Sequence, residues 1–222
     1  LALSALHVLA STLGSDAAAG VVDDETRAFL AGLDGWIVPP FGNGFGFAFE
    51  DEDTGKTTSN LGIASTEDGE LRLTFDIRYA VTQNADDIMG AIERTVAAAG
   101  GRMLDHTVDA PYYVPKDSWE VTVLTEAYDD VTGIPAEPFS TGGGTHARVV
   151  PNSINFGPGF PEDPASIAAL REAGVIAPQP TFVKNGGAHG ANECMSVKDF
   201  RNAFPIFVIG LLRYDAALAE RE

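Results

Sequence analysis

The stretch between residues 71 and 79 constrains the fold more than any other part of the sequence. Apolar and polar residues alternate strictly along it, with apolar side chains at Leu71, Leu73, Phe75, Ile77 and Tyr79. This alternation predicts a β-strand with one buried and one solvent-facing side. Asp68-Gly69 lies just before it, and this dipeptide favours the positive φ angles of a tight two-residue turn. We therefore predict a β-hairpin whose partner strand covers residues 60–65.

Helical patterns lie on both sides of this hairpin. Asn84 is a predicted N-cap, two aspartates occupy the first turn, and Gly100-Gly101 ends the helix. Further helices are predicted at residues 1–13 and 23–33, a loop at residues 34–56 and a strand at residues 103–108. The order helix, hairpin, helix, strand predicts a ferredoxin-like βαββαβ unit without its first strand, in an α/β (α+β) protein. The missing strand would precede Leu1, as would part of the first helix.

The two prolines of residues 110–115 mark a linker. We therefore predict two domains, residues 1–110 and residues 111–222. In the second domain we expect a helix capped by Asp117, a glycine-rich loop, a short strand at residues 153–156 and a final helix. Ser196 is the predicted N-cap of that helix, and Pro205 is expected to kink it.

Charge and composition exclude several classes of function. The chain has 222 residues with 32 acidic and 14 basic side chains, giving a formal net charge of −18. Such a surface repels phosphate backbones and anionic lipids, so we expect neither nucleic acid nor membrane as a partner.

Apolar runs fall short of the roughly 20 residues that cross a bilayer. The single cysteine, Cys194, cannot form an internal disulfide, and we predict a cytoplasmic protein.

Three features could carry chemistry, and each has a plainer interpretation. His189 lies in a loop of small residues, where an imidazole can reach a metal or simply face solvent. The run from Gly142 to Arg148 could form a backbone nest for an anion, with Thr145 and Arg148 as added donors, or a flexible loop. Arg78, near the end of the predicted strand, could bind a carboxylate or form a surface ion pair with Asp76 or Glu70.

Three segments together resemble a known family: residues 142–148 (GGGTHAR), 151–158 (PNSINFGP) and 188–193 (AHGANE). Their order resembles the C-terminal half of the dizinc aminoacylase and dipeptidase family, specifically its PepV-like, carnosinase-related bacterial dipeptidases. Residues 58–63, 75–79 and 110–118 resemble the lid domain of that family and the return of the chain into the catalytic domain. The resemblance covers most of the chain after about Thr58.

This resemblance implies a metallopeptidase in which two Zn²⁺ ions, or Mn²⁺ or Co²⁺ in their place, hold a water that attacks a peptide carbonyl. By the resemblance, His189 would be a metal ligand, and Asn192 and Glu193 would support its loop. Arg78 would bind the terminal carboxylate of a small peptide substrate. The loop that includes Gly143, Gly144, Thr145 and Arg148 would line the substrate site. His146 stands where relatives tend to have tyrosine, so it receives no catalytic role.

The other motifs of the family are absent from this sequence. Its His-x-Asp motif, bridging aspartate, Glu-Glu pair and lid histidine all lie upstream of the matched region in relatives. The resemblance therefore implies a C-terminal fragment that carries no catalytic residue, does not retain zinc on its own and is inactive alone. The intact parent would be a dipeptidase.

Two alternatives remain open at this stage. One is a binding or oligomerisation module without catalysis, in which an exposed sheet edge of the lid pairs two copies into a homodimer. The other is a deacylase or desuccinylase of the same family, because a carboxylate-binding Arg78 suits those substrates equally well.

Overall fold

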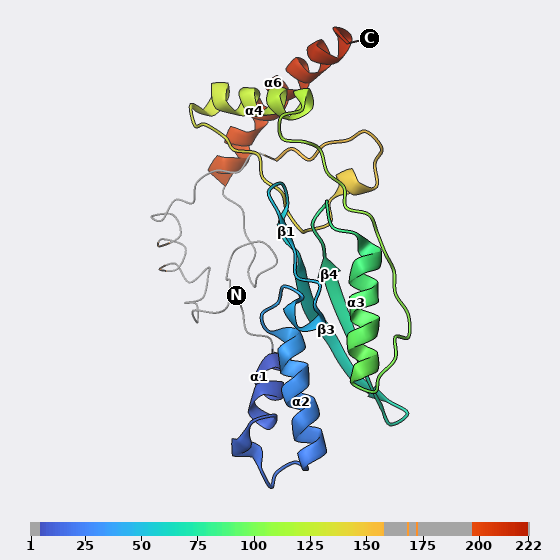
Figure 1. Cartoon of the computed structure of the whole chain (residues 1–222). Helices are drawn as coiled ribbons and strands as arrows, with labels where there is room; N and C mark the ends of the chain where they lie inside the picture. Colours follow the sequence, from blue (N-terminus) through green and yellow to red (C-terminus); the bar gives the residue numbers. More distant parts are fainter. Residues whose placement is uncertain (1–4, 158–167, 169–171, 173–196, 222) are drawn as a thin grey trace. The chain divides into compact units, whose positions relative to one another are not determined.

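The computed structural model describes residues 5–157, 168, 172 and 197–221 (Figure 1). The chain forms two compact units. The first runs through Tyr113 and also includes Phe139–Gly144; the second comprises Val114–Pro138 and the chain from Thr145 onward. Helices and small antiparallel sheets together make an α+β protein, as predicted. The predicted boundary after residue 110 stays a prediction.

The centre of the first unit is the predicted hairpin. Strands β3 (Thr58–Glu67) and β4 (Glu70–Arg78) pair antiparallel, and Glu67 lies opposite Glu70 across the turn. Asp68 and Gly69 have φ angles of 54° and 81°, which confirms the predicted tight turn. The register shifts between Leu61 and Ile63, so Ile63 falls on the polar face with Thr74 and is 59% exposed.

The apolar face of the hairpin is covered by helices and by a short aromatic turn. Helix α2 (Asp24–Ile37) contributes Leu33 and Ile37 to a cluster with Leu61. Helix α3 (Ala85–Ala98) contributes Ile88 and Ala91 to a second cluster with Phe45 and Phe47. Figure 1 shows α3 running beside the hairpin. Helix α1 (Ala5–Leu13) packs against α2, and the short 3₁₀ turn η1 (Asp16–Ala18) joins the two.

The predicted N-cap of α3 is confirmed, and α2 begins next to the predicted start at residue 23, where Asp23 itself is the cap. Asn84 accepts a hydrogen bond from the backbone N–H of Asp86 at 2.8 Å. Asp23 accepts one from the N–H of Thr26 at 2.8 Å. Each carboxyl or amide oxygen satisfies a backbone donor that the helix leaves unpaired.

The prediction of a loop throughout residues 34–56 was wrong. Helix α2 continues to Ile37, a 3₁₀ turn η2 (Asn43–Phe45) follows, and β1 (Glu50–Asp51) pairs with β2 (Gly55–Lys56). Apolar residues do not recur at regular intervals in this segment, because its glycines and aromatic residues are placed for close packing against neighbouring elements. A Cβ at Gly44 would lie 2.0 Å from the carbonyl oxygen of Gly35, so the backbone of η2 rests directly on α2.

The predicted strand at residues 103–108 is also wrong, because the structure has no strand there. In an extended segment, Leu104 and Val108 would lie on the same side as His106, and Met103 would lie on the opposite side with Asp105. Neither side would therefore be apolar enough to pack against a core. Leu104 and Val108 are 60% and 48% exposed. Within the described residues the sheet formed by β3 has two strands, and the ferredoxin-like arrangement is not confirmed.

In the part of the second unit that the structure describes, helix α4 (Trp119–Thr132) packs against helix α6 (Val197–Ala219). Trp119 and Tyr214 place their rings 5.0 Å apart, and Arg213 donates to Asp130 at 2.6 Å. Ile206 is fully buried. Pro205 lies inside α6, as the sequence indicated; its predicted kink stays a prediction, and Ser196 lies outside the described residues.

Two local predictions in this unit need correction. Ser118, not Asp117, caps α4, because its hydroxyl accepts from the N–H of Val121 at 3.4 Å. Residues 153–156 form no strand: the hydroxyl of Ser153 donates back to the carbonyl of Val150 at 2.7 Å, and Phe156 turns its ring against Phe207. Side-chain bonding to the local backbone and packing onto a helix replace strand pairing here.

Within the described residues, α6 is long and apolar enough to cross a membrane by length and composition. Little of its apolar stretch is buried inside the structure. A single helix of this kind is weak evidence for a membrane segment. The expected absence of a membrane partner and the cytoplasmic location therefore stay predictions.

Candidate functional site

Arg78 is the last residue of β4 and lies on the polar face of the hairpin, opposite Thr58. Its side chain is 52% exposed. Its Nη2 donates to Asp76 Oδ2 at 3.3 Å, two residues back on the same face. The plainer prediction of a surface ion pair with Asp76 is thus confirmed, whereas Glu70 pairs with Arg102 at 2.8 Å. A long, exposed pair of this kind contributes about 0 to 1 kcal/mol, so it leaves Arg78 available to a stronger partner.

The glycine-rich loop lies against the aliphatic part of Arg78. A Cβ built on Gly142 would sit 3.2 Å from Arg78 Cδ and 3.8 Å from Arg78 Cβ. The first distance is tighter than ordinary van der Waals contact, so the bare backbone of Gly142 packs on the arginine stem. The structure therefore brings together two of the features that the sequence singled out, within one unit.

Hydrogen bonds fix this loop. The hydroxyl of Ser140 donates to the backbone carbonyl of Asp53 at 2.8 Å, which ties the loop to the turn between β1 and β2. The N–H of Gly143 donates to Thr141 Oγ1 at 3.2 Å. Gly143 and Gly144 are exposed, and a Cβ on Gly144 would meet no atom within 4 Å. Both predicted substrate-binding glycines thus lie on an accessible stretch of backbone.

The turn that receives Ser140 is itself joined to the segment after Arg78. Asp51 Oδ1 accepts from the N–H and hydroxyl of Thr54 at 2.6 and 2.8 Å. Asp51 Oδ2 accepts from the N–H and hydroxyl of Thr82 at 3.2 and 2.9 Å. Thr54 Oγ1 also accepts from the N–H of Val81 at 3.0 Å. One carboxylate therefore holds the β1–β2 turn to the chain that leaves β4.

These four hydrogen bonds lower the pKa of Asp51 to about 2 from 3.8. Partial burial acts in the opposite direction and is the largest single influence, but the donors from Thr54 and Thr82 together outweigh it. The carboxylate is thus the form that the folded structure favours. Sequence reasoning missed this group, although an aspartate followed three residues later by threonine is a turn signal.

We expect Asp51→Asn to reduce stability in a pH-dependent way. The folded pKa lies below the unfolded one, so the contribution of the carboxylate is complete above pH 3.8 and is lost as the pH falls towards about 2. The difference in melting temperature between wild type and Asp51→Asn should therefore be large at pH 6 and shrink at pH 2.5. Thermal unfolding followed by circular dichroism measures it.

The matched control is Glu52→Gln, at the exposed neighbouring carboxylate. It should show no comparable convergence with wild type. A difference between wild type and Asp51→Asn that stays constant from pH 6 to pH 2.5 would contradict the assignment.

Other predicted site residues fall elsewhere. Thr145 and Arg148 belong to the second unit, where Thr145 precedes the 3₁₀ turn η3 (His146–Arg148). Thr145 is half-buried and Arg148 is exposed. The structure does not bring them together with Arg78 in one unit, and their roles stay predictions.

His189, Asn192 and Glu193 lie outside the described residues, so their predicted roles also stay predictions. Among the residues that are described, no group of three or more histidine, cysteine, aspartate or glutamate side chains is arranged to hold a metal ion. The described part of the chain does not by itself supply a dizinc cage. The two-zinc prediction rests on the sequence resemblance alone.

No family model matches the chain. It is 34% identical over 118 residues to a Bacillus subtilis protein named "Putative dipeptidase YtjP", a match that covers 53% of this chain and 25% of that protein. It is 30% identical over 121 residues to a "Putative dipeptidase" of Staphylococcus epidermidis, covering 54% of this chain and 26% of the relative. A Staphylococcus aureus protein of the same description is 27% identical over 141 residues, 63% of this chain and 30% of the relative.

The chain is thus similar, over about half its length, to bacterial proteins that carry the name "Putative dipeptidase". The matched region spans only about a quarter of the length of the first two relatives.

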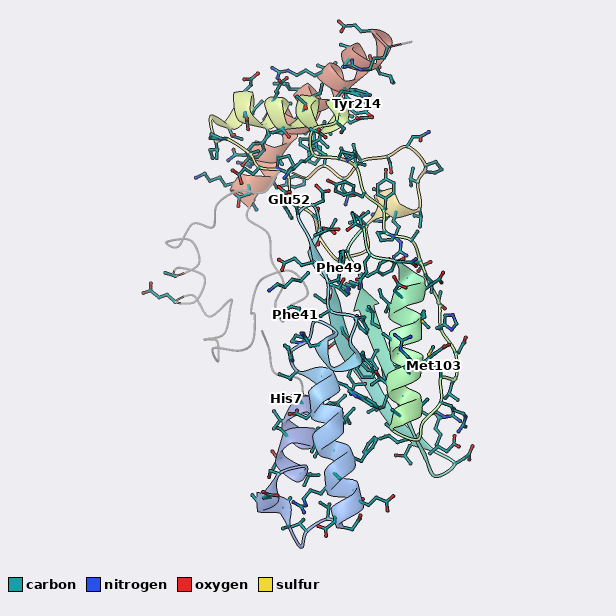
Figure 2. All side chains as sticks on the ribbon, in the orientation of Figure 1. His7, Phe41, Phe49, Glu52, Met103 and Tyr214 are labelled. Atoms are coloured by element: carbon teal, nitrogen blue, oxygen red, sulfur yellow. The ribbon has the colours of Figure 1, made fainter. Side chains whose placement is uncertain are left out.

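Figure 2 shows the side chains of the described residues on the same ribbon, with Phe49 and Glu52 labelled near the β1–β2 turn.

Proposed function

We propose that these 222 residues form part of a dipeptidase, an enzyme that hydrolyses the peptide bond of small unblocked peptides. The observation that carries this proposal is the similarity, over 53% to 63% of the chain, to three proteins that carry the name "Putative dipeptidase". The matched part corresponds to 25% to 30% of the length of those relatives. We therefore propose that the activity belongs to a longer polypeptide that contains this chain, and that the chain alone is inactive.

In this proposal Arg78 binds the terminal carboxylate of the substrate. Its guanidinium is half exposed at the end of a strand and is paired with Asp76 by one long contact of 3.3 Å. A substrate carboxylate could instead accept two parallel N–H bonds from the planar guanidinium. Two parallel charge-assisted bonds are stronger than one long exposed contact, so a substrate carboxylate would compete with Asp76 for the guanidinium.

Water activation is assigned to groups outside the described residues. By the sequence resemblance, two zinc ions would supply it and His189 would hold one of them. Because the described residues form no metal cage, we derive no catalytic step through zinc. The role of this part of the chain is to bind and orient the peptide.

A hydrolysis assay tests the proposal. The complete polypeptide encoded by the reading frame of this chain is incubated with unblocked L-dipeptides, and released amino acids are quantified. We expect hydrolysis, loss of activity with a chelator and recovery with Zn²⁺. If a broad dipeptide panel stays intact in the presence of Zn²⁺, Mn²⁺ or Co²⁺, the proposal is wrong.

A further inference from the structure

We propose that the loop Phe139–Gly144 sets the position of the Arg78 guanidinium, with Gly142 as the contact and Ser140 as the anchor, so that the loop controls carboxylate binding. This inference rests on the proposed function and deepens it. It concerns two residues, Gly142 and Ser140, to which neither the sequence resemblance nor the names of the relatives assign such a role.

The stem of Arg78 is in close contact with the backbone of Gly142. Arginine has a long flexible stem, and holding it in one geometry costs side-chain entropy of up to about 2 kcal/mol. The backbone of Gly142 lies where a Cβ would be 3.2 Å from Arg78 Cδ, so it restricts the stem from one side. The Nη2 end of the side chain also donates a hydrogen bond to Asp76, two residues back on the same strand. Together these contacts hold the planar guanidinium of Arg78 in one orientation before a ligand binds.

The loop is anchored independently of Arg78. The Ser140 hydroxyl bonds the carbonyl of Asp53, and Asp51 bonds the same turn to Thr82 in the segment that follows Arg78. The loop and the end of β4 are thus tied to one small framework. A side chain at position 142 would have to displace either the loop, against the Ser140 bond, or the arginine stem.

Three variants of the complete polypeptide test this idea. Gly142→Val places branched carbon atoms where the Arg78 stem lies, and Ser140→Ala removes the anchor without adding bulk. Gly90→Ala is the matched control, because a Cβ there would lie 3.2 Å from Nη1 of another arginine, Arg94, on α3. Circular dichroism and thermal melting verify that each variant is folded.

The readout is carboxylate binding by Arg78 itself and needs no turnover. The Arg78 Nε–Hε resonance, identified by its absence in Arg78→Lys, is followed in ¹⁵N-labelled protein kept inactive by a chelator, so that the ligand stays intact, during titration with L-alanyl-L-alanine and with its C-terminal amide. We expect the resonance of wild type and Gly90→Ala to respond to the free carboxylate and not to the amide. Gly142→Val should weaken that binding about tenfold, as loss of one of two charge-assisted hydrogen bonds predicts, and Ser140→Ala should weaken it by a smaller factor.

Several results would overturn the inference. It is wrong if the Arg78 resonance of the wild type ignores the carboxylate, or if folded Gly142→Val and Ser140→Ala bind as tightly as wild type. It is equally wrong if Gly90→Ala weakens binding as much as Gly142→Val. If Gly142→Val does not fold, the Ser140→Ala titration decides. A carboxylate response that depends on Gly142 in a protein without peptidase activity would support the positioning role and refute the proposed function separately.

Discussion

Replacing Phe45 with alanine is expected to lower the free energy of unfolding of the first unit by about 3 to 5 kcal/mol. Phe45 is 4% exposed, and its ring lies 5.2 Å from Trp36, 5.7 Å from Phe47 and 5.0 Å, edge-on, from Phe75. Deleting it removes buried apolar surface and leaves a cavity between η2, α2 and the hairpin. Urea unfolding followed by Trp36 fluorescence, in a Trp119→Phe background, measures the change.

The control is Phe139→Ala, because Phe139 is 88% exposed. Its effect on stability should stay within about 0.5 kcal/mol. Equal losses in the two variants would show that the aromatic cluster is not the core of this unit. The result matters for the site because Phe75 belongs to the strand that ends at Arg78.

Arg78→Met is expected to reduce kcat/KM of the complete polypeptide for unblocked dipeptides by about 10- to 100-fold. Methionine keeps much of the stem volume but removes every donor, and about 1.5 to 3 kcal/mol of charged hydrogen bonding is lost. Arg78→Lys should recover only part of the rate, because lysine keeps the charge but not the planar fork. Steady-state kinetics on one dipeptide provide the comparison.

Arg102→Met is the matched control for this prediction. Arg102 is also exposed and also paired with a carboxylate of the hairpin, Glu70 in β4. Unlike Arg78, it is not among the close neighbours of Gly142, Gly143 or Gly144. Its removal should leave kcat/KM close to wild type. If both methionine variants lose activity to the same extent, general loss of positive charge explains the effect and the specific role of Arg78 is wrong.

The parts of the fold that the sequence predicted well are those fixed by local chemistry. Asp68-Gly69 adopts two positive φ angles because few other dipeptides do so at low cost, and Asn84 caps α3 because its amide reaches a nearby backbone donor. Apolar and polar residues alternate in the sequence up to Tyr79 because one face of β4 packs on the core and the other faces solvent.

The parts that could not be predicted depend on contacts between distant residues. The aromatic turn around Phe45 has no period, since its shape follows the surface of α2 and the hairpin. At residues 103–108 the apolar side chains suggested a strand, but an individual segment cannot show whether a partner strand exists. The approach of Gly142 to Arg78 joins residues 64 positions apart, and nothing in either local sequence encodes it.

In the proposed function, this chain binds the free carboxylate of a dipeptide for hydrolysis. The most direct measurement is a set of four kcat/KM values, for wild type and Arg78→Met, each with a dipeptide and its C-terminal amide. We predict that wild type prefers the free carboxylate by at least about tenfold and that Arg78→Met abolishes this preference. An identical preference in both proteins, or no hydrolysis of either substrate by wild type, would contradict the account.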